Sequence, residues 1–163
     1  MLQQFRDPQL EVSGDPIGFY PREFYVLDNF SSFQVFWHGR LWATVEHAYH
    51  AAKYFGVAPE VVEKIANARS AHEACQIGRS YKSIRRPDWA ERKVQIMEEI
   101  CRCKMTQHEY VRRKLLETGD LLIVEDSPKD AFWGWGPNRD GRNELGKIWM
   151  RLRDELRAAL SST

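Results

Sequence analysis

The sequence predicts a helix-rich α+β fold with a small β-sheet or hairpin. Most of the chain repeats apolar residues at helical spacing, whereas only two stretches have the short β-rich runs of strands. The length of 163 residues is that of one domain. Residues 1–18 are mostly polar and contain Pro and Gly, so we expect an N-terminal arm followed by a single domain over residues 19–163.

The expected strands form a hairpin and one isolated run. Residues 33–37 and 40–42 are rich in β-forming side chains, and His38-Gly39 between them has the length and composition of a tight turn. Residues 121–125 are a short and nearly continuous apolar run, which indicates a buried strand.

The expected helices each begin at a residue that favours a helix start. Apolar residues then recur three or four positions apart on one face. The segments run from Thr44 to about Phe55, from Pro59 onward, from Ser70 to Gly78 as its C-terminal glycine, from Asp88 onward, from His108 to Glu117 before Gly119, and from Asn143 to about Leu160.

Composition excludes several classes of protein. The net charge of +1 provides no global field to collect nucleic acid, so phosphate contacts would need a local cluster such as residues 79–86, which equally fits a solvated loop. Three cysteines argue against a disulfide framework, and no zinc-ligand spacing is present, so we expect no metal and no cofactor. Neither a membrane-spanning run nor a signal peptide is evident, which favours the cytoplasm.

Glu46 is the first candidate for a chemical role. It lies in the first turn of the helix that Thr44 begins, directly after the hairpin and near Trp42 and His47. A glutamate there can simply stabilise the helix dipole, by a few tenths to about 1 kcal/mol. Alternatively, its carboxylate faces a pocket lined by loops. The residue pattern alone leaves both interpretations open.

A loop with aromatic residues and glycines is the second candidate. Asp130, Trp133, Gly134 and Trp135 follow the predicted buried strand. Glycines let a backbone approach a ligand closely, indole rings offer flat stacking faces, and Asp130 would supply a second carboxylate. A loop that anchors itself on the core through its aromatic residues would have the same composition.

The start of the last helix is the third candidate. Free N–H groups at a helix N-terminus bind anions, so Asn143 could meet a phosphate, although Asn is also an ordinary N-cap. Gly146 in the first turn would permit close packing. The lysine of a P-loop is missing from this segment.

Carboxylate chemistry is the most economical enzyme hypothesis. The sequence contains no nucleophile elbow, no Cys/His nucleophile signature and no dinucleotide fingerprint. Cleavage of a ribosyl C–N bond needs a carboxylate that stabilises the sugar cation and orients water, with a proton or an aromatic ring for the departing base. Glu46, Asp130 and a Trp would suffice.

Five segments in order resemble the NADAR, or YbiA-like, family. The likeness covers the chain from about Phe19 to the last helix. The matching segments are Leu27–Phe33, Trp42–His47, Asp88-Trp89, Asp130–Gly134 and Asn143–Lys147.

The resemblance implies a YbiA-like α+β fold and a metal-independent N-glycosidase. Two substrate classes are associated with the family. One is ADP-ribose N-linked to guanine in a nucleoside or nucleic acid, and the other is the early riboflavin-pathway ribosylamino-pyrimidinone phosphates. We favour the first, because Trp135 stands where the family often has Asp and adds stacking surface suited to a purine.

The resemblance also implies roles for particular residues. Through the Thr44–His47 motif Glu46 becomes the catalytic carboxylate, with Trp89 and Asp130 as the other catalytic members. From the residues alone, Trp89 is only the first residue of a capped helix. The predicted substrate-binding residues are Tyr20, Asn29, Phe30, Trp42, His47, Arg86, Trp133, Gly134 and Asn143.

Two other classes of function stay open at this point. The domain could be a non-catalytic ADP-ribose or nucleotide sensor, or an interaction domain whose aromatic residues form a partner surface. The partners expected for the enzyme are a small nucleotide sugar or ADP-ribosylated nucleic acid, with no membrane. The sequence does not indicate an oligomeric state.

Overall fold

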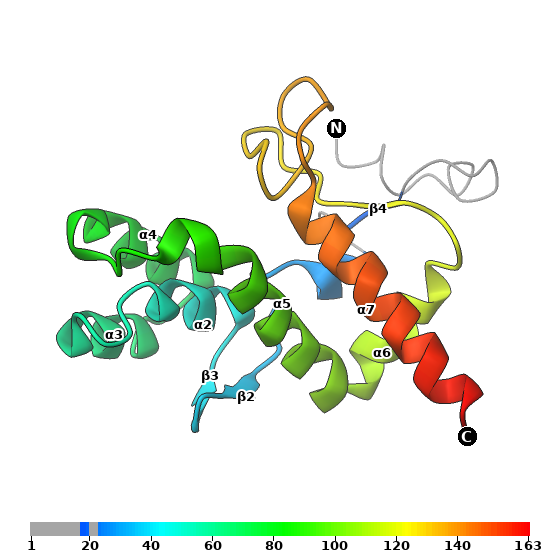
Figure 1. Ribbon diagram of the computed structural model, residues 1–163, viewed down its shortest axis with the longest axis horizontal. Coiled ribbons are helices and arrows are strands. Elements are labelled where there is room, and N and C mark those ends of the chain that lie inside the picture. Colours follow the sequence, from blue (N-terminus) through cyan, green and yellow to red (C-terminus); the bar gives the residue numbers. More distant parts are fainter. Residues whose placement is uncertain (1–16, 20–22) are drawn as a thin grey trace. The chain divides into compact units, whose positions relative to one another are not determined.

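The computed structural model of the protein describes residues 17–19 and 23–163 (Figure 1). The described residues form helices and two small two-stranded sheets, which confirms the predicted helix-rich α+β fold. Contacts group them into two compact units. One contains the described residues up to Asp28 together with His108–Thr163, and the other is Asn29–Gln107. A single domain over residues 19–163 stays a prediction, and each unit is described separately.

The Asn29–Gln107 unit begins with the predicted hairpin. Strand β2 (Val35–Trp37) pairs antiparallel with β3 (Arg40–Trp42). His38 and Gly39 between them have φ values of 51° and 77°. Positive φ at both central residues is the geometry of a two-residue turn that matches the twist of the strands. The hairpin and its turn are therefore confirmed.

Helices make up the rest of this unit, with α2 packed against the other three. They are α2 (Val45–Ala52), α3 (Pro59–Ala66), α4 (Ala71–Ser80), a 3-10 turn (Lys82–Ile84) and α5 (Trp89–Gln107). Every residue of α2 is buried, which is unusual for a helix with polar side chains. The polar groups of α2 therefore face other protein groups.

The helix starts agree with the prediction better than the helix ends. The Thr44 side chain accepts a hydrogen bond from the His47 N–H and caps α2, and Ser70 caps α4 in the same way. However, α2 ends at Ala52 rather than Phe55. The prediction that Gly78 ends α4 was wrong, because the helix continues to Ser80 and buries Gly78.

The other unit contains a small parallel sheet and two longer helices. Strand β1 (Ile17–Gly18) pairs with β4 (Ile123–Val124), so the last two residues of the segment expected to be an arm form a strand. Residues 1–16 of that segment lie outside the described residues. The remaining elements are a 3-10 turn (Tyr25–Leu27), α6 (Glu109–Glu117) and α7 (Glu144–Ser161).

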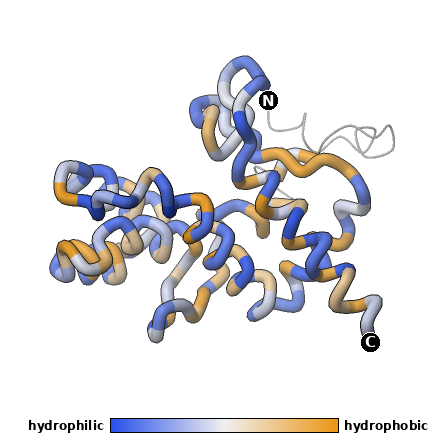
Figure 2. The backbone as a smooth tube through the Cα atoms, in the orientation of Figure 1, coloured by the Kyte–Doolittle hydropathy of each residue, from blue (hydrophilic) through white to orange (hydrophobic). Residues whose placement is uncertain are grey.

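Helix α7 packs on β4 and α6 with an apolar stripe. The predicted inward residues from Leu145 to Leu156 are buried, whereas Leu160 is 55% exposed and that prediction was wrong. Strand β4 is shorter than the predicted residues 121–125, and Leu122 is exposed. Among the described residues, no helix has both the length and the apolar composition needed to cross a bilayer, and polar residues interrupt the apolar ones along the tube in Figure 2.

Candidate active site

Glu46 is a buried carboxylate at the start of α2. Its backbone N–H donates to the Asn29 carbonyl at 3.2 Å, and Thr44 caps the same turn. Its side chain faces one turn along the helix, where Nε2 of His50 lies 2.8 Å from Oε1. A carboxylate with 7% exposure needs such partners, because burying a charge alone is costly.

His50 is the direct hydrogen-bond partner of Glu46. The close packing of its ring against Gly78, rather than a second hydrogen bond, fixes the ring's position. Burial lowers the pKa of His50, although the hydrogen bond and charge of Glu46 oppose this shift. The imidazole is therefore neutral near pH 7 and donates its Nε2–H to the carboxylate. Among the described residues Nδ1 has no hydrogen-bond partner.

Gly78 provides the space for the His50 ring. A Cβ at Gly78 would lie 2.6 Å from Cγ of the ring and closer still to Nδ1, which is sterically forbidden. Tyr54 donates its hydroxyl to the Gly78 carbonyl at 2.5 Å and so holds this part of α4. The glycine that the sequence suggested as a helix end instead admits His50.

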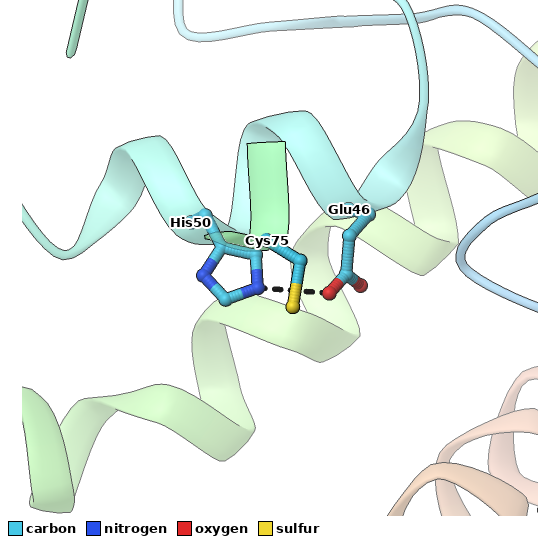
Figure 3. Close-up of side chains that lie close together, drawn as sticks. All are labelled: Glu46, His50 and Cys75. Atoms are coloured by element: carbon cyan, nitrogen blue, oxygen red, sulfur yellow. Dashed lines mark hydrogen bonds and ion pairs between the residues drawn. The ribbon is translucent and has the colours of Figure 1, made fainter. Parts of the chain in front are cut away.

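Cys75 of α4 completes a group of three ligand-type side chains with Glu46 and His50 (Figure 3). One carboxylate oxygen, one imidazole nitrogen and the sulfur all lie within 4.8 Å of one another, and all three residues are buried. Burial raises the pKa of the Cys75 thiol, and the charge of Glu46 adds to the effect. We call this group the Glu46–His50–Cys75 cluster.

Lys53 adds a cation beside the cluster. It follows α2 directly, is largely buried, and has a pKa lowered to about 8 by burial, with the charge of Glu46 opposing that shift. Its Nζ lies 5.3 Å from the ring centroid of Tyr49 and 5.8 Å from that of Trp89. Cation–π contacts of this length are attractive.

Trp89, the first residue of α5, lies next to Tyr49 with ring centroids 5.1 Å apart. The Arg86 backbone N–H donates to the Lys53 carbonyl at 2.7 Å, which holds the segment before α5 at the end of α2. Trp89 therefore shares its surroundings with Lys53, which in turn interacts with the charge of Glu46. The guanidinium of Arg86 makes two hydrogen bonds to Asp88, at 2.6 and 2.9 Å.

The other predicted substrate-binding residues of this unit differ in their burial and in their hydrogen bonds. Trp42 is buried and donates its indole N–H to the Trp37 carbonyl, and both ring nitrogens of His47 are hydrogen-bonded, to Thr44 and the Ala68 carbonyl. By contrast, the buried Oδ1 of Asn29 has no partner among the described residues, and Phe30 is 37% exposed.

Asp130 belongs to the unit that contains α7. Its Oδ1 accepts hydrogen bonds from the backbone N–H groups of Phe132 and Trp133, at 2.9 and 2.8 Å. This is the bonding of an Asx turn, which shapes the start of the aromatic loop. Trp133 is half-buried, and a Cβ on Gly134 would lie 2.5 Å from the Glu125 carbonyl oxygen. Gly134 thus permits the loop to pack on the residue after β4.

Asn143 stands at the N-cap position of α7, as the sequence predicted, but its side chain does not cap the helix. Its backbone is left-handed (φ 52°), and its side chain makes no capping hydrogen bond to α7. Instead its amide accepts from the Glu125 N–H and donates to the Ile123 carbonyl, both at 2.9 Å. The side chain therefore holds β4 at the start of α7, and Gly146 allows the close packing that was predicted, since a Cβ there would meet the Asn143 side chain.

The site roles assigned to these residues remain predictions, and Tyr20 lies outside the described residues. The sequence interpretation missed His50, Lys53 and Cys75. Glu46, His50 and Lys53 have the spacing of residues on one helix face, which was an available signal. Cys75 carried no such signal, because it comes from another helix.

Comparison with known proteins identifies relatives over most of the chain. The family model described as the NADAR domain matches residues 5–157. An N-glycosidase of Nostoc punctiforme is 43% identical over 84% of this chain and 88% of its own length. A riboflavin biosynthesis protein of Vibrio vulnificus is 39% identical over 92% of this chain, which spans 41% of that protein.

A solved structure agrees with these relatives. The NMR structure of the Escherichia coli protein YbiA has a TM-score of 0.82, is 31% identical, and is matched over 90% of this chain and 88% of its own length. Relatives named N-glycosidases and riboflavin biosynthesis proteins support N-glycosidase activity in this family. The chain belongs to the NADAR domain family, and its fold is that of YbiA.

Proposed function

We propose that this protein is a metal-independent N-glycosidase that hydrolyses a ribosyl–base C–N bond at Glu46. The favoured substrate is ADP-ribose N-linked to guanine, either in a nucleoside or in nucleic acid. The observation that carries the proposal is the buried Glu46 carboxylate, held at 2.8 Å by a neutral His50 with the cationic Lys53 nearby.

The Glu46 carboxylate suits the charge that develops on the sugar. Departure of the base leaves positive charge on C1′ and the ring oxygen, and a nearby carboxylate stabilises that charge. It also accepts a proton from the attacking water. Because His50 donates a hydrogen bond without bringing a charge, it fixes the carboxylate and preserves its negative charge.

Lys53 is placed in the role of proton donor to the departing base. Its lowered pKa of about 8 brings the ammonium group close to the range in which a general acid works well near neutral pH. The buried rings of Tyr49 and Trp89 beside it make the surroundings of the ammonium group apolar, which favours transfer of its proton.

Glu46 and Lys53 together account for every proton that moves during hydrolysis. Water forms a bond to C1′ and gives a proton to Glu46, while the C–N bond breaks and its electron pair stays on the base nitrogen. The base takes a proton from Lys53, and the proton on Glu46 then returns to Lys53 or to solvent. The products are a free sugar hydroxyl and a neutral base.

The choice of guanine-linked ADP-ribose rests on the sequence alone. Trp135 stands where the family often has Asp, and an indole is suited to a purine. A second candidate substrate is a ribosylamino-pyrimidinone phosphate of the riboflavin pathway. The riboflavin biosynthesis relatives support it, although this chain spans only part of them.

The test offers the protein both substrates and measures free base by chromatography. ADP-ribosylated guanosine, ADP-ribosylated DNA and the ribosylamino-pyrimidinone phosphate are incubated separately with the wild type and with Glu46→Gln. We expect base release from a guanine-linked substrate by the wild type alone. Release only from the pyrimidinone would move the activity to the second candidate.

Two outcomes would contradict the proposal. If wild type and Glu46→Gln behave alike on every substrate, the hydrolytic role of Glu46 is wrong. If the wild type binds ADP-ribose tightly in calorimetry but releases no base, the protein is a sensor that retains the binding residues.

A further inference from the structure

The Glu46–His50–Cys75 cluster presents three different ligand atoms to one small volume in a chain whose sequence has no metal motif (Figure 3). We propose that these residues bind a thiophilic divalent cation, with Zn²⁺ as the best fit, and that the bound ion inhibits the enzyme. The binding stands on the cluster alone, whereas the inhibition rests on the proposed function.

The donor set selects the kind of ion. Thiolate sulfur and imidazole nitrogen favour zinc and related ions over magnesium or calcium, which prefer sites made of oxygen atoms. One carboxylate, one imidazole and one thiolate are three protein ligands, which leave the fourth tetrahedral position for water. The cluster thus has the ligand number of an open zinc site.

The geometry needs only small side-chain movements. The ligand atoms of the three residues already lie within 4.8 Å of one another. Zinc bonds are about 2.0–2.3 Å long, so ligand atoms around one ion are separated by roughly 3–4 Å. Glu46 and His50 share one face of α2, and Cys75 projects from α4, which packs against α2.

The same surroundings limit the affinity. Lys53 and Arg79 are close enough to lower the pKa of His50 through their charges, and they repel a cation. Strong zinc sites usually give the ligand histidine a second hydrogen-bond partner, and Nδ1 of His50 has none among the described residues. We therefore expect a reversible, inhibitory ion rather than a structural one.

Binding removes the groups that the proposed hydrolysis uses. The ion replaces the hydrogen bond between Glu46 and His50 with two coordinate bonds. The His50 proton moves from Nε2 to Nδ1, and the Cys75 thiol releases its proton to solvent, as each becomes a ligand. The Glu46 oxygens then neutralise the ion and no longer serve the sugar cation or the attacking water. No oxidation or reduction is involved.

Cobalt(II) titration of the chelator-treated full chain tests the binding. A cobalt–thiolate bond gives a near-ultraviolet charge-transfer absorption, so we expect this band to saturate at one ion per chain and to disappear when Zn²⁺ is added. Cys75→Ser should abolish the band and weaken zinc binding about tenfold or more. Cys103→Ser is the control, because Cys103 lies in the same unit outside the cluster.

One further variant guards against unfolding as an explanation. His50→Gln keeps an N–H donor for Glu46 but offers a poor zinc ligand, so it should fold and lose affinity. Absence of the band in the wild type, or its retention in Cys75→Ser with loss in Cys103→Ser, overturns the site. Circular dichroism checks that each variant is folded before its metal binding is compared with that of the wild type.

A separate measurement tests the inhibition. Zn²⁺ should lower base release by the wild type and a chelator should restore it, while the ratio of activity with and without Zn²⁺ should be closer to one in Cys75→Ser. Unchanged wild-type activity at saturating Zn²⁺ would reject the inhibition. If no substrate is cleaved at all, the proposed function fails, and the cobalt titration still decides whether the ion binds.

Discussion

Two regions of this molecule attracted the same prediction from sequence, and they use their polar side chains differently. In the Asn29–Gln107 unit, Glu46 and His50 bond to each other, and Nδ1 of His50 and Oδ1 of Asn29 have no partner among the described residues. In the aromatic loop, Asp130 and Asn143 bond to backbone groups of their own unit.

The difference separates groups available for chemistry from groups that build the fold. Buried polar atoms are normally satisfied, and an exception needs an explanation such as a ligand. Asp130 and Asn143 shape a loop and hold a strand, and backbone bonding explains both residue types. The cluster around Glu46 has no such explanation, so we place the chemistry there.

Lys53→Met should produce the largest change among the variants that sharpen this comparison. Loss of the ammonium removes the proposed proton donor, and we expect kcat to fall by about 10²–10³-fold. The free energy of unfolding should rise by about 1–3 kcal/mol, because a buried cation is replaced by an apolar side chain of similar length. Kinetics and urea unfolding measure the two effects, with the exposed Lys82→Met as control.

The pH dependence of that stability gain has a defined sign. The pKa of Lys53 is about 8 in the folded protein and 10.5 in the unfolded chain, so the unfolded chain binds more protons between these values. Wild-type stability therefore rises with pH across this window. The advantage of Lys53→Met should be constant below pH 8 and shrink towards pH 10.5. A gain independent of pH would contradict a buried cation.

Asn143→Ala should have the second largest effect, a decrease in the free energy of unfolding. The substitution leaves the Glu125 N–H and the Ile123 carbonyl buried without their partner, and alanine tolerates the left-handed backbone less well than asparagine. We expect about 3 kcal/mol of destabilisation by urea unfolding. Asn138→Ala, at an exposed position of the same loop, should change stability little. Equal effects would mean that the Asn143 amide does not hold β4.

Gly78→Ala tests the space beside His50. The added Cβ would overlap the imidazole, so we expect about 2 kcal/mol of destabilisation and a loss of kcat as His50 moves away from Glu46. A double-mutant cycle with His50→Ala checks the cause, because removing the ring should relieve much of the stability loss and leave only the contact with the His50 Cβ at 2.8 Å. Additive losses in the cycle would place the strain elsewhere.

Substitutions of Asp130 should have the smallest effect on stability. They distinguish a role in the turn from a role for the carboxylate charge. Asp130→Asn retains an oxygen that accepts from Phe132 and Trp133, whereas Asp130→Ala removes it. We expect Asp130→Ala to lose about 1 kcal/mol of stability and more activity than Asp130→Asn. If Asp130→Asn abolishes base release instead, the carboxylate charge is catalytic, as the family resemblance implies.

The sequence predicted local structure well where local chemistry determines it. The two-residue turn at His38-Gly39 and the caps at Thr44 and Ser70 depend on neighbouring residues, and all three are confirmed. Gly78 shows the limit. A glycine late in a helix has the pattern of a helix end, and only the packing of α4 on α2 reveals that it admits an imidazole.

The candidate site shows the same limit. Glu46 was predicted from its place in a motif, while Cys75 reaches the cluster only through helix packing, which no spacing in the sequence reveals. Asn143 illustrates the opposite error. Its residue type fits an N-cap, but its side chain serves a strand 18 and 20 residues earlier in the chain.

Base release by Glu46→Gln is the measurement that tests the central claim most directly. Glutamine has nearly the same shape and still accepts the hydrogen bond from His50, so the melting temperature should change little. The account predicts that kcat falls by about 10³-fold or more while the protein stays folded. A folded Glu46→Gln protein that releases base at the wild-type rate would contradict it.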